Sequence, residues 1–160
     1  MDDRVRAHDF FAAHELIHRW WFNYDEGNFD VLRSLLTDDV HFTCRTDTGT
    51  TDFEEFVRAD VHGRDTVMRW QSEHRMNSPY PLRHNGTNVH IVEPRGEEAS
   101  FASYIHVTQV VDMQVVGLPA GIVRGVERRE ADGALRIAAL EVVLDTMTSR
   151  PFGDLRTFEI

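Results

Sequence analysis

The chain has 160 residues, of which 41% are hydrophobic and 10% aromatic, and this is enough to bury one core, so a single domain over residues 1–160 is predicted. Seventeen Lys and Arg residues against 27 Asp and Glu residues give a net charge of -10, which argues against nucleic acid and anionic membranes as partners. The single cysteine, Cys44, excludes an internal disulfide, and the sequence shows no signal-peptide or membrane-spanning pattern, so a cytoplasmic location is predicted.

Helical patterns come first along the chain. Apolar residues recur at three- and four-residue spacing over residues 9–24, which predicts a first helix. A short second helix is expected over residues 29–36, before a strand at 40–43. Two further helices are expected over residues 52–57 and 63–74.

The second half of the chain consists of extended patterns separated by turn signals. Strands are predicted over residues 88–93, 99–111, 122–129 and 135–144, with turns at 94–96, 117–119 and 132–133. A block of helices followed by a block of strands indicates an α+β fold, with helices packed on one face of a curved, antiparallel or mixed sheet. Such a sheet, wrapped by the N-terminal helices, forms a cone with a central pocket that suits a small molecule.

Three segments carry a family resemblance. They are YDEGNFDVLRSLLTDDVHF at residues 24–42, HNGTN at residues 84–88 and ERREADGALRIAAL at residues 127–140. In this order and spacing they resemble the SnoaL-like group of the nuclear-transport-factor-2-like (NTF2-like) superfamily, and within it the group of scytalone dehydratase and hexachlorocyclohexane dehydrochlorinase. The resemblance covers most of the chain and implies the same cone fold.

The resemblance also implies a site. Dehydratase-like members pair an Asp at the end of the first helix with a His at the start of a strand, and these roles fall on Asp25 and His84; Tyr24 falls on a catalytic Tyr position. The second catalytic Tyr is replaced by Cys44, and the second His falls near His106 or Gln109. The catalytic Lys and Arg of the dehydrochlorinase have no match, so the substrates of those enzymes are not expected.

The chemistry of these residues fits the implied roles. A His paired with a carboxylate can take a proton from carbon or oxygen at neutral pH, which makes His84 the candidate base and Asp25 the group that orients it. Tyr24 is the candidate donor to a developing oxyanion. Read without the resemblance, Asp25 is more simply a solvated helix end, His84 a surface loop residue and Tyr24 a core aromatic.

Four further residues are expected to contact the substrate. Asn88 lies an even number of positions after His84, and an even spacing on a strand returns a side chain to the same face. His106 shares a strand face with Tyr104, and either that face or the opposite one looks into the cone. Cys44 and Trp21 are the remaining candidates for the pocket wall, although both are also simply explained as buried residues.

A competing motif is HELIH at residues 14–18, which matches the H-E-x-x-H pattern of zinc proteases. That interpretation needs a third ligand and a larger scaffold, and the chain offers only the scattered His41, Asp60 and His62. We interpret the motif as a coincidence and predict neither a catalytic metal nor a cofactor.

The sequence therefore favours a cofactor-independent lyase, cyclase or isomerase acting on a small, largely apolar ring compound. The alternatives are a non-catalytic subunit resembling the β subunits of aromatic-ring-hydroxylating dioxygenases, which share the cone fold, and a carrier that binds a ligand without turnover. Because the outer face of a curved sheet commonly packs against a copy of itself, a homodimer or higher homo-oligomer is expected.

Overall fold

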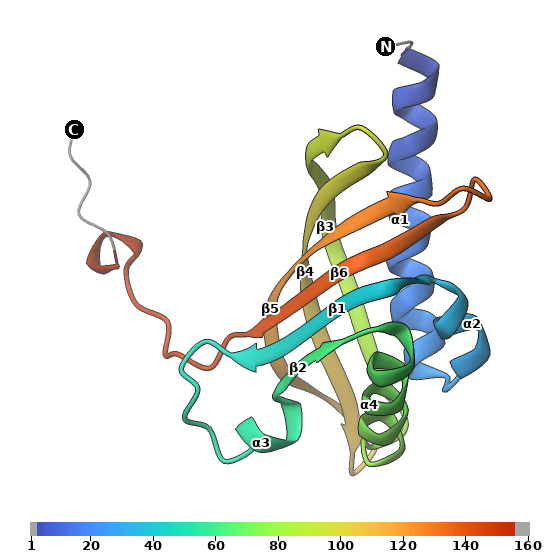
Figure 1. Cartoon of the computed structure of the whole chain (residues 1–160). Coiled ribbons are helices and arrows are strands. Elements are labelled where there is room, and N and C mark those ends of the chain that lie inside the picture. The colour runs from blue at the N-terminus through green and yellow to red at the C-terminus, as the bar shows by residue number, and fades with distance from the viewer. Residues whose placement is uncertain (1–2, 156–160) are drawn as a thin grey trace.

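The computed structural model describes residues 3–155, with residues 3–9 and residue 95 described by their backbone only. Helices precede most of the sheet, as Figure 1 shows. The helices are α1 (Asp3–Asp25), α2 (Phe29–Ser34), α3 (Glu54–Val57), α4 (Arg64–Met76) and the 3-10 helix η1 (Phe152–Asp154). The strands are β1 (Leu36–Thr46), β2 (Ala59–His62), β3 (Leu82–Arg95), β4 (Glu98–Val111), β5 (Gln114–Arg129) and β6 (Leu135–Leu144). The predicted α+β class is confirmed.

The six strands form one mixed sheet in the order β2-β1-β6-β5-β4-β3. All neighbouring strands are antiparallel except β1 and β6, which are parallel. Helix α1 packs mainly against β3 at one edge of the sheet, and α4 packs against β1 near the other edge (Figure 1). The two longest helices therefore lie near opposite edges of the curved sheet and, with its inner face, enclose a space.

Helix α1 carries the predicted apolar stripe. Its buried core residues include Leu16, Ile17, Trp20, Trp21 and Tyr24, at the spacing of one helix face. The helix ends where Gly27 adopts a positive φ of 68° and donates its N–H to the carbonyl of Tyr24, a conformation that costs glycine little. None of the described helices combines the length and the apolar composition needed to cross a membrane.

Alternation along the strands separates an inner face from an outer face. On β1, Phe42 and Cys44 are buried inside, so His41, the residue before Phe42, points outward. On β4, Ile105 and Val107 are buried inside, and this alternation places His106 outside. The inner face, together with α1 and α4, forms the core.

The turn predicted at residues 117–119 is wrong. The β4–β5 hairpin turns instead at Asp112 and Met113, which both have positive φ (49° and 61°). Leu118 and Pro119 lie within β5, at a register shift opposite the step from His106 to Thr108. A bulge accommodates Pro119 because proline has no N–H for a regular ladder position.

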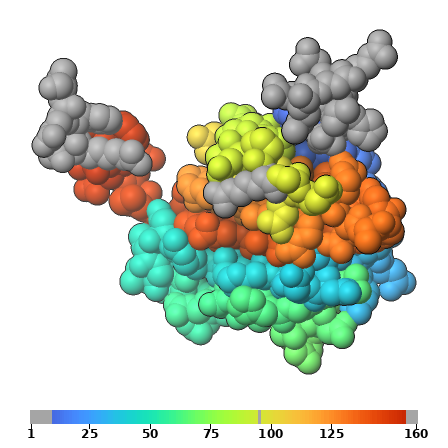
Figure 2. Space-filling view, turned by 45° about the horizontal axis from the view of Figure 1, so that its top comes forward, coloured from blue at the N-terminus to red at the C-terminus, as the bar shows by residue number. Residues whose placement is uncertain are grey.

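Strands β2 and β3 also differ from the sequence-based expectation. Strand β2 was not predicted, because four residues are too few to show a period. Strand β3 begins at Leu82, six residues earlier than expected, so that His84 lies on the strand itself. After β6, the segment that carries η1 extends away from the sheet, as Figure 1 and Figure 2 show.

Candidate active site

A cavity of about 350 Å³ lies between the inner face of the sheet and the helices. Its wall is almost entirely apolar and draws on β1, α3, α4, β4 and β5. The apolar side chains that line it include Phe42, Phe56, Val57, Trp70, Ile105, Val107 and Leu118. A cavity of this size and polarity suits a small ring compound with few polar groups.

His84 lines the polar end of the cavity, and Asp25, which is not itself a lining residue, is hydrogen bonded to it. The Oδ1 of Asp25 lies 2.5 Å from the Nδ1 of His84, and the Oδ2 accepts the backbone N–H of His84 at 2.7 Å. Because an ionised carboxylate only accepts hydrogen bonds, the proton of the neutral imidazole lies on Nδ1, and Nε2 keeps its lone pair. The two residues are thus held in the geometry of a base and the group that orients it.

The main-chain carbonyl of Asp25 is hydrogen bonded as well as its side chain. The buried Arg75 of α4 donates to the carbonyl oxygen of Asp25 from Nε at 3.0 Å and from Nη2 at 2.8 Å. The same guanidinium donates to the carbonyl of Pro79 at 3.1 Å. Arg75 therefore joins the end of α1 to the end of α4 and to the loop that leads into β3.

Two aromatic side chains fix the ring of His84. The indole of Trp21 stacks on it with ring centroids 5.1 Å apart and an interplanar angle of 8°. The ring of Tyr24 meets it edge-on at 5.2 Å and 85°. Residue 86 must stay small for this stack, because a Cβ added to Gly86 would lie 3.1 Å from Cδ1 of Trp21.

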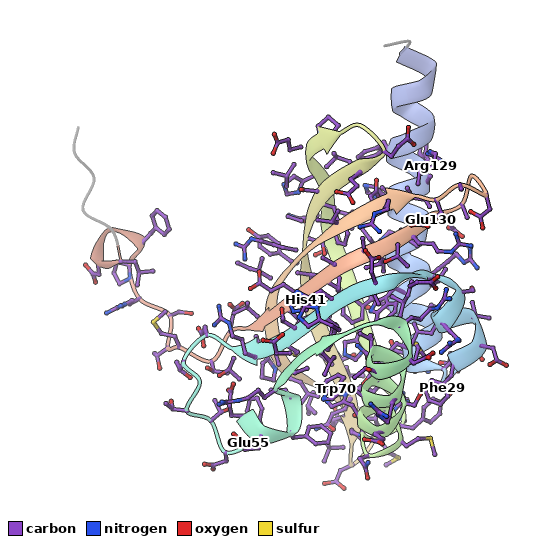
Figure 3. All side chains as sticks on the ribbon, in the orientation of Figure 1. Phe29, His41, Glu55, Trp70, Arg129 and Glu130 are labelled. Atoms are coloured by element: carbon purple, nitrogen blue, oxygen red, sulfur yellow. The ribbon has the colours of Figure 1, made fainter. Side chains whose placement is uncertain are left out.

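A second polar pair, formed by Tyr24 and His74, lies beside the first. The hydroxyl of Tyr24 is hydrogen bonded to Nδ1 of His74, and the indole of Trp70 stacks on the His74 ring at 4.7 Å (Trp70 is labelled in Figure 3). Burial, reinforced by the neighbouring His84 and Arg75, lowers the pKa of His74 from 6.5 to about 4. Burial likewise raises the pKa of Tyr24, so both members of this pair are neutral at physiological pH.

Proton counting shows what the Tyr24–His74 pair can offer. The neutral pair has two polar protons, one on the phenol and one on the imidazole, and their mutual hydrogen bond uses one of them. The other proton remains, either on Tyr24 Oη or on His74 Nε2, and this Nε2 is buried without a partner among the described residues. The indole Nε1 of Trp21 is buried and unpartnered in the same way. The polar end therefore combines one base with neutral donors.

The expected pocket residues divide into two groups. Trp21, Tyr24, Cys44 and His84 line the cavity, whereas Asn88 and His106 do not. Asn88 is exposed because it lies in a register shift between Thr87 and His90, with φ at 56°, and this irregularity ends the simple alternation from His84. His106 is exposed on the outer face, so the expectations that placed these two residues in the pocket are corrected.

Cys44 is a wall residue with an unreactive thiol. Burial raises its pKa to about 12, so the thiol stays protonated at neutral pH.

Gln71, His74 and Gln109 also line the cavity; of these the sequence analysis named only Gln109, as one of two positions near the second catalytic His of the family. A signal for Gln71 and His74 was present: they lie four and seven positions, respectively, after the buried Val67, on the apolar face of α4, where polar residues are uncommon.

The HELIH motif lies on α1. His14 packs against Phe10, with ring centroids 4.2 Å apart, and its ring lies 5.8 Å from that of His18. Within the described part of the chain, one group of three potential metal ligands converges, and it contains neither His14 nor His18.

The comparisons with known proteins establish the family. The SnoaL-like domain family matches residues 5–141, and the chain belongs to that family. No curated protein matches the sequence.

Solved structures share the fold at low sequence identity. A candidate dehydratase of the NTF2-like family from Streptomyces avermitilis has a TM-score of 0.68 at 17% identity, over 87% of this chain and 97% of that one. A protein from Catenulispora acidiphila in complex with S-DNPA has a TM-score of 0.68 at 24% identity, over 89% and 95%. The β subunit of a candidate aromatic-ring-hydroxylating dioxygenase from Novosphingobium aromaticivorans has a TM-score of 0.71 at 14% identity, over 90% and 94%. The chain therefore has the NTF2-like cone fold.

Proposed function

We propose that this protein is a cofactor-independent lyase, cyclase or isomerase that acts on a small, largely apolar ring compound. The observation that carries the proposal is that His84, hydrogen bonded to Asp25, lies at the polar end of an otherwise apolar cavity. A few convergent polar groups at one end of an apolar pocket are the usual mark of a ligand or catalytic site.

In the proposed reaction, Nε2 of His84 removes a proton from a ring carbon next to a carbonyl group. Asp25 stabilises the imidazolium that forms, and the charge that develops on the carbonyl oxygen is stabilised by the donor that the Tyr24–His74 pair leaves free. The imidazolium then returns the proton. Delivery to a leaving hydroxyl releases water, and delivery to another carbon of the substrate completes an isomerisation.

The apolar wall contributes by excluding water. In a site of low polarity the interactions between Asp25, His84 and the developing oxyanion are stronger than in bulk solvent. Trp21 stacks on His84 and so keeps the imidazole in one orientation while the ligand enters and leaves.

Proton exchange on a simple ketone tests the proposal without knowledge of the natural substrate. Bicyclic ring ketones incubated with the protein in D₂O are expected to exchange the C–H next to the carbonyl, as followed by proton NMR. His84→Gln should slow the exchange by roughly 10²- to 10⁴-fold, the range for loss of a general base. The matched control is His106→Gln, which changes an exposed His on the outer face of the same sheet and should exchange at the wild-type rate.

The non-catalytic alternatives make different predictions. The likeness to a dioxygenase β subunit supports a subunit role, but an open cavity with a hydrogen-bonded polar end fits an enzyme or a carrier better than a structural subunit. Ligand binding with no exchange in any ketone tested, and no difference between wild type and His84→Gln, would favour the carrier. A stable complex with a second, different chain would favour the subunit.

A further inference from the structure

The outer face of the sheet carries a group of side chains that the proposed reaction does not use. Strands β1 and β2 are antiparallel, and their register places His41 directly opposite His62. Asp60 lies two residues before His62 and opposite Thr43, so alternation puts its side chain on the same outer face. Figure 3 labels His41 on β1.

The donor atoms of these three residues converge. Nε2 of His41 lies 2.8 Å from Oδ1 of Asp60, and Nε2 of His62 lies 3.8 Å from the same oxygen. One donor atom from each of the three residues can be chosen so that all lie within 4.8 Å of one another. Around a tetrahedral zinc ion, donor atoms lie about 3.3 Å apart, so the two observed separations bracket the required one.

The side chains have room to complete the geometry. The His41 and His62 rings are stacked at 3.8 Å with an interplanar angle of 11°, and a metal bound by both must lie near the plane of each ring, so at least one ring has to rotate. Their side chains are 40% and 69% exposed, which leaves that rotation free.

The chemistry of the donor set points to a particular class of ion. Two imidazole nitrogens with one carboxylate oxygen suit divalent transition metals, whereas Ca²⁺ and Mg²⁺ prefer oxygen ligands alone. We propose that His41, Asp60 and His62 form a binding site for a divalent transition metal, with Zn²⁺ as the reference ion and water in the remaining coordination positions.

The proposed metal site is separate from the cavity but connected to it through the chain. On β1, His41 points outward while its neighbour Phe42 lines the cavity. Strand β2 is a four-residue edge strand that joins α3 to α4, and both helices line the cavity. A metal ion that links β2 to β1 would therefore stabilise this edge and the helices on either side of it.

Zinc titration of the tag-free protein by isothermal calorimetry at neutral pH tests the proposal. The expected stoichiometry is one ion per chain. The double variant His41→Gln/His62→Gln should abolish binding, and Asp60→Asn should weaken it by at least about tenfold, because it removes the only anionic ligand. Zinc should also raise the melting temperature of the wild type, measured against EDTA, and leave that of the double variant unchanged.

Two single variants serve as controls. His90→Gln removes an exposed His from β3, and His18→Gln breaks the i, i+4 pair with His14 on α1, a second arrangement that binds metals on helices. Both should bind zinc like the wild type. The proposal is overturned if wild type and the double variant titrate alike, if His18→Gln removes binding, or if the wild type binds no zinc; the last result would leave a His–Asp ion pair only. The three ligands are exposed, so circular dichroism in EDTA should confirm that every variant is folded.

Discussion

A His–carboxylate group lies at each face of the sheet, and the two groups differ mainly in their exposure. The side chains of Asp25 and His84 on the inner face are 5% and 11% exposed, whereas that of Asp60 on the outer face is 76% exposed. An exposed pair is screened by water and salt and contributes little by itself, whereas an enclosed pair keeps its electrostatic strength. The same residue types are therefore suited to proton transfer on one face and to metal binding on the other.

The largest expected effect comes from changing the inner carboxylate without changing its shape. In Asp25→Asn the amide can donate to Nδ1 of His84, which favours the tautomer with its proton on Nε2 and removes the base from the cavity. Exchange of the ring ketones should fall on the order of 10³-fold. Nitrogen NMR of the imidazole should show the change of tautomer directly.

Asp60→Asn is the control for this change, because it makes the same substitution on the outer face. It should leave the exchange rate and the His84 tautomer unchanged. A folded Asp25→Asn protein with the wild-type exchange rate would show that the inner pair takes no part in proton transfer.

The next effect concerns acid stability and His74. The pKa of His74 in the folded protein is about 4, below its usual 6.5, so between these values the unfolded chain binds a proton that the folded chain does not. The contribution of neutral His74 to the free energy of unfolding is fully present above pH 6.5. It declines as the pH falls from 6.5 towards 4, and no further loss from this group is expected below pH 4. Protonation of His74 in the unfolded chain should therefore lower the free energy of unfolding by up to about 3 kcal/mol.

Urea denaturation of wild type and His74→Gln, at neutral pH and near pH 4.5, measures this loss. The wild type should lose more stability than His74→Gln over this interval, whatever the absolute stability of the variant. His62→Gln, which removes an exposed His from the outer face, should keep the wild-type dependence. Equal losses in wild type and His74→Gln would contradict the assignment of a buried, neutral His74.

The smallest expected effect comes from adding one methyl group to a glycine, at Gly86 beside the buried Trp21 or at Gly117 beside the exposed His106. In Gly86→Ala the new Cβ would lie 3.1 Å from the buried Trp21 ring and should displace it from His84, with a loss of about 1 kcal/mol in stability. In Gly117→Ala on β5 the new Cβ meets only Nε2 of the exposed His106 at 3.4 Å, and that side chain can move. Urea denaturation should show a loss in the first variant and little change in the second.

Periodicity and family resemblance together predicted much of the fold. The apolar spacing of α1 and the turn at residues 132–133 needed only local information, and both were predicted correctly. The β4–β5 turn was misplaced because Gly117 and Pro119 are strong turn formers, yet the chain turns at Asp112 and Met113, of which only Asp112 is a common turn residue.

The site was predictable where the resemblance covered it and unpredictable where a single bulge mattered. Asp25 and His84 are 59 positions apart in the chain, so only the family pattern could suggest that they meet. Alternation correctly separated the two faces of β4, but it could not say which one faces the cavity, and His106 lies on the outer face. The prediction that Asn88 lines the pocket was wrong for a related reason, because the bulge in β3 shifts the alternation by one residue.

Arg75 has a consequence for the electrostatics of the helix that ends at the site. Asp25 is the last residue of α1, and the carbonyl end of a helix carries partial negative charge, which is unfavourable for a carboxylate. The guanidinium of Arg75, bonded to the carbonyl of that same residue, places a positive charge where the helix dipole and the carboxylate both need one. Position 75 thus belongs to the charge balance of the site although its side chain is committed to backbone carbonyls, and loss of its charge should weaken the end of α1 before it alters the cavity wall.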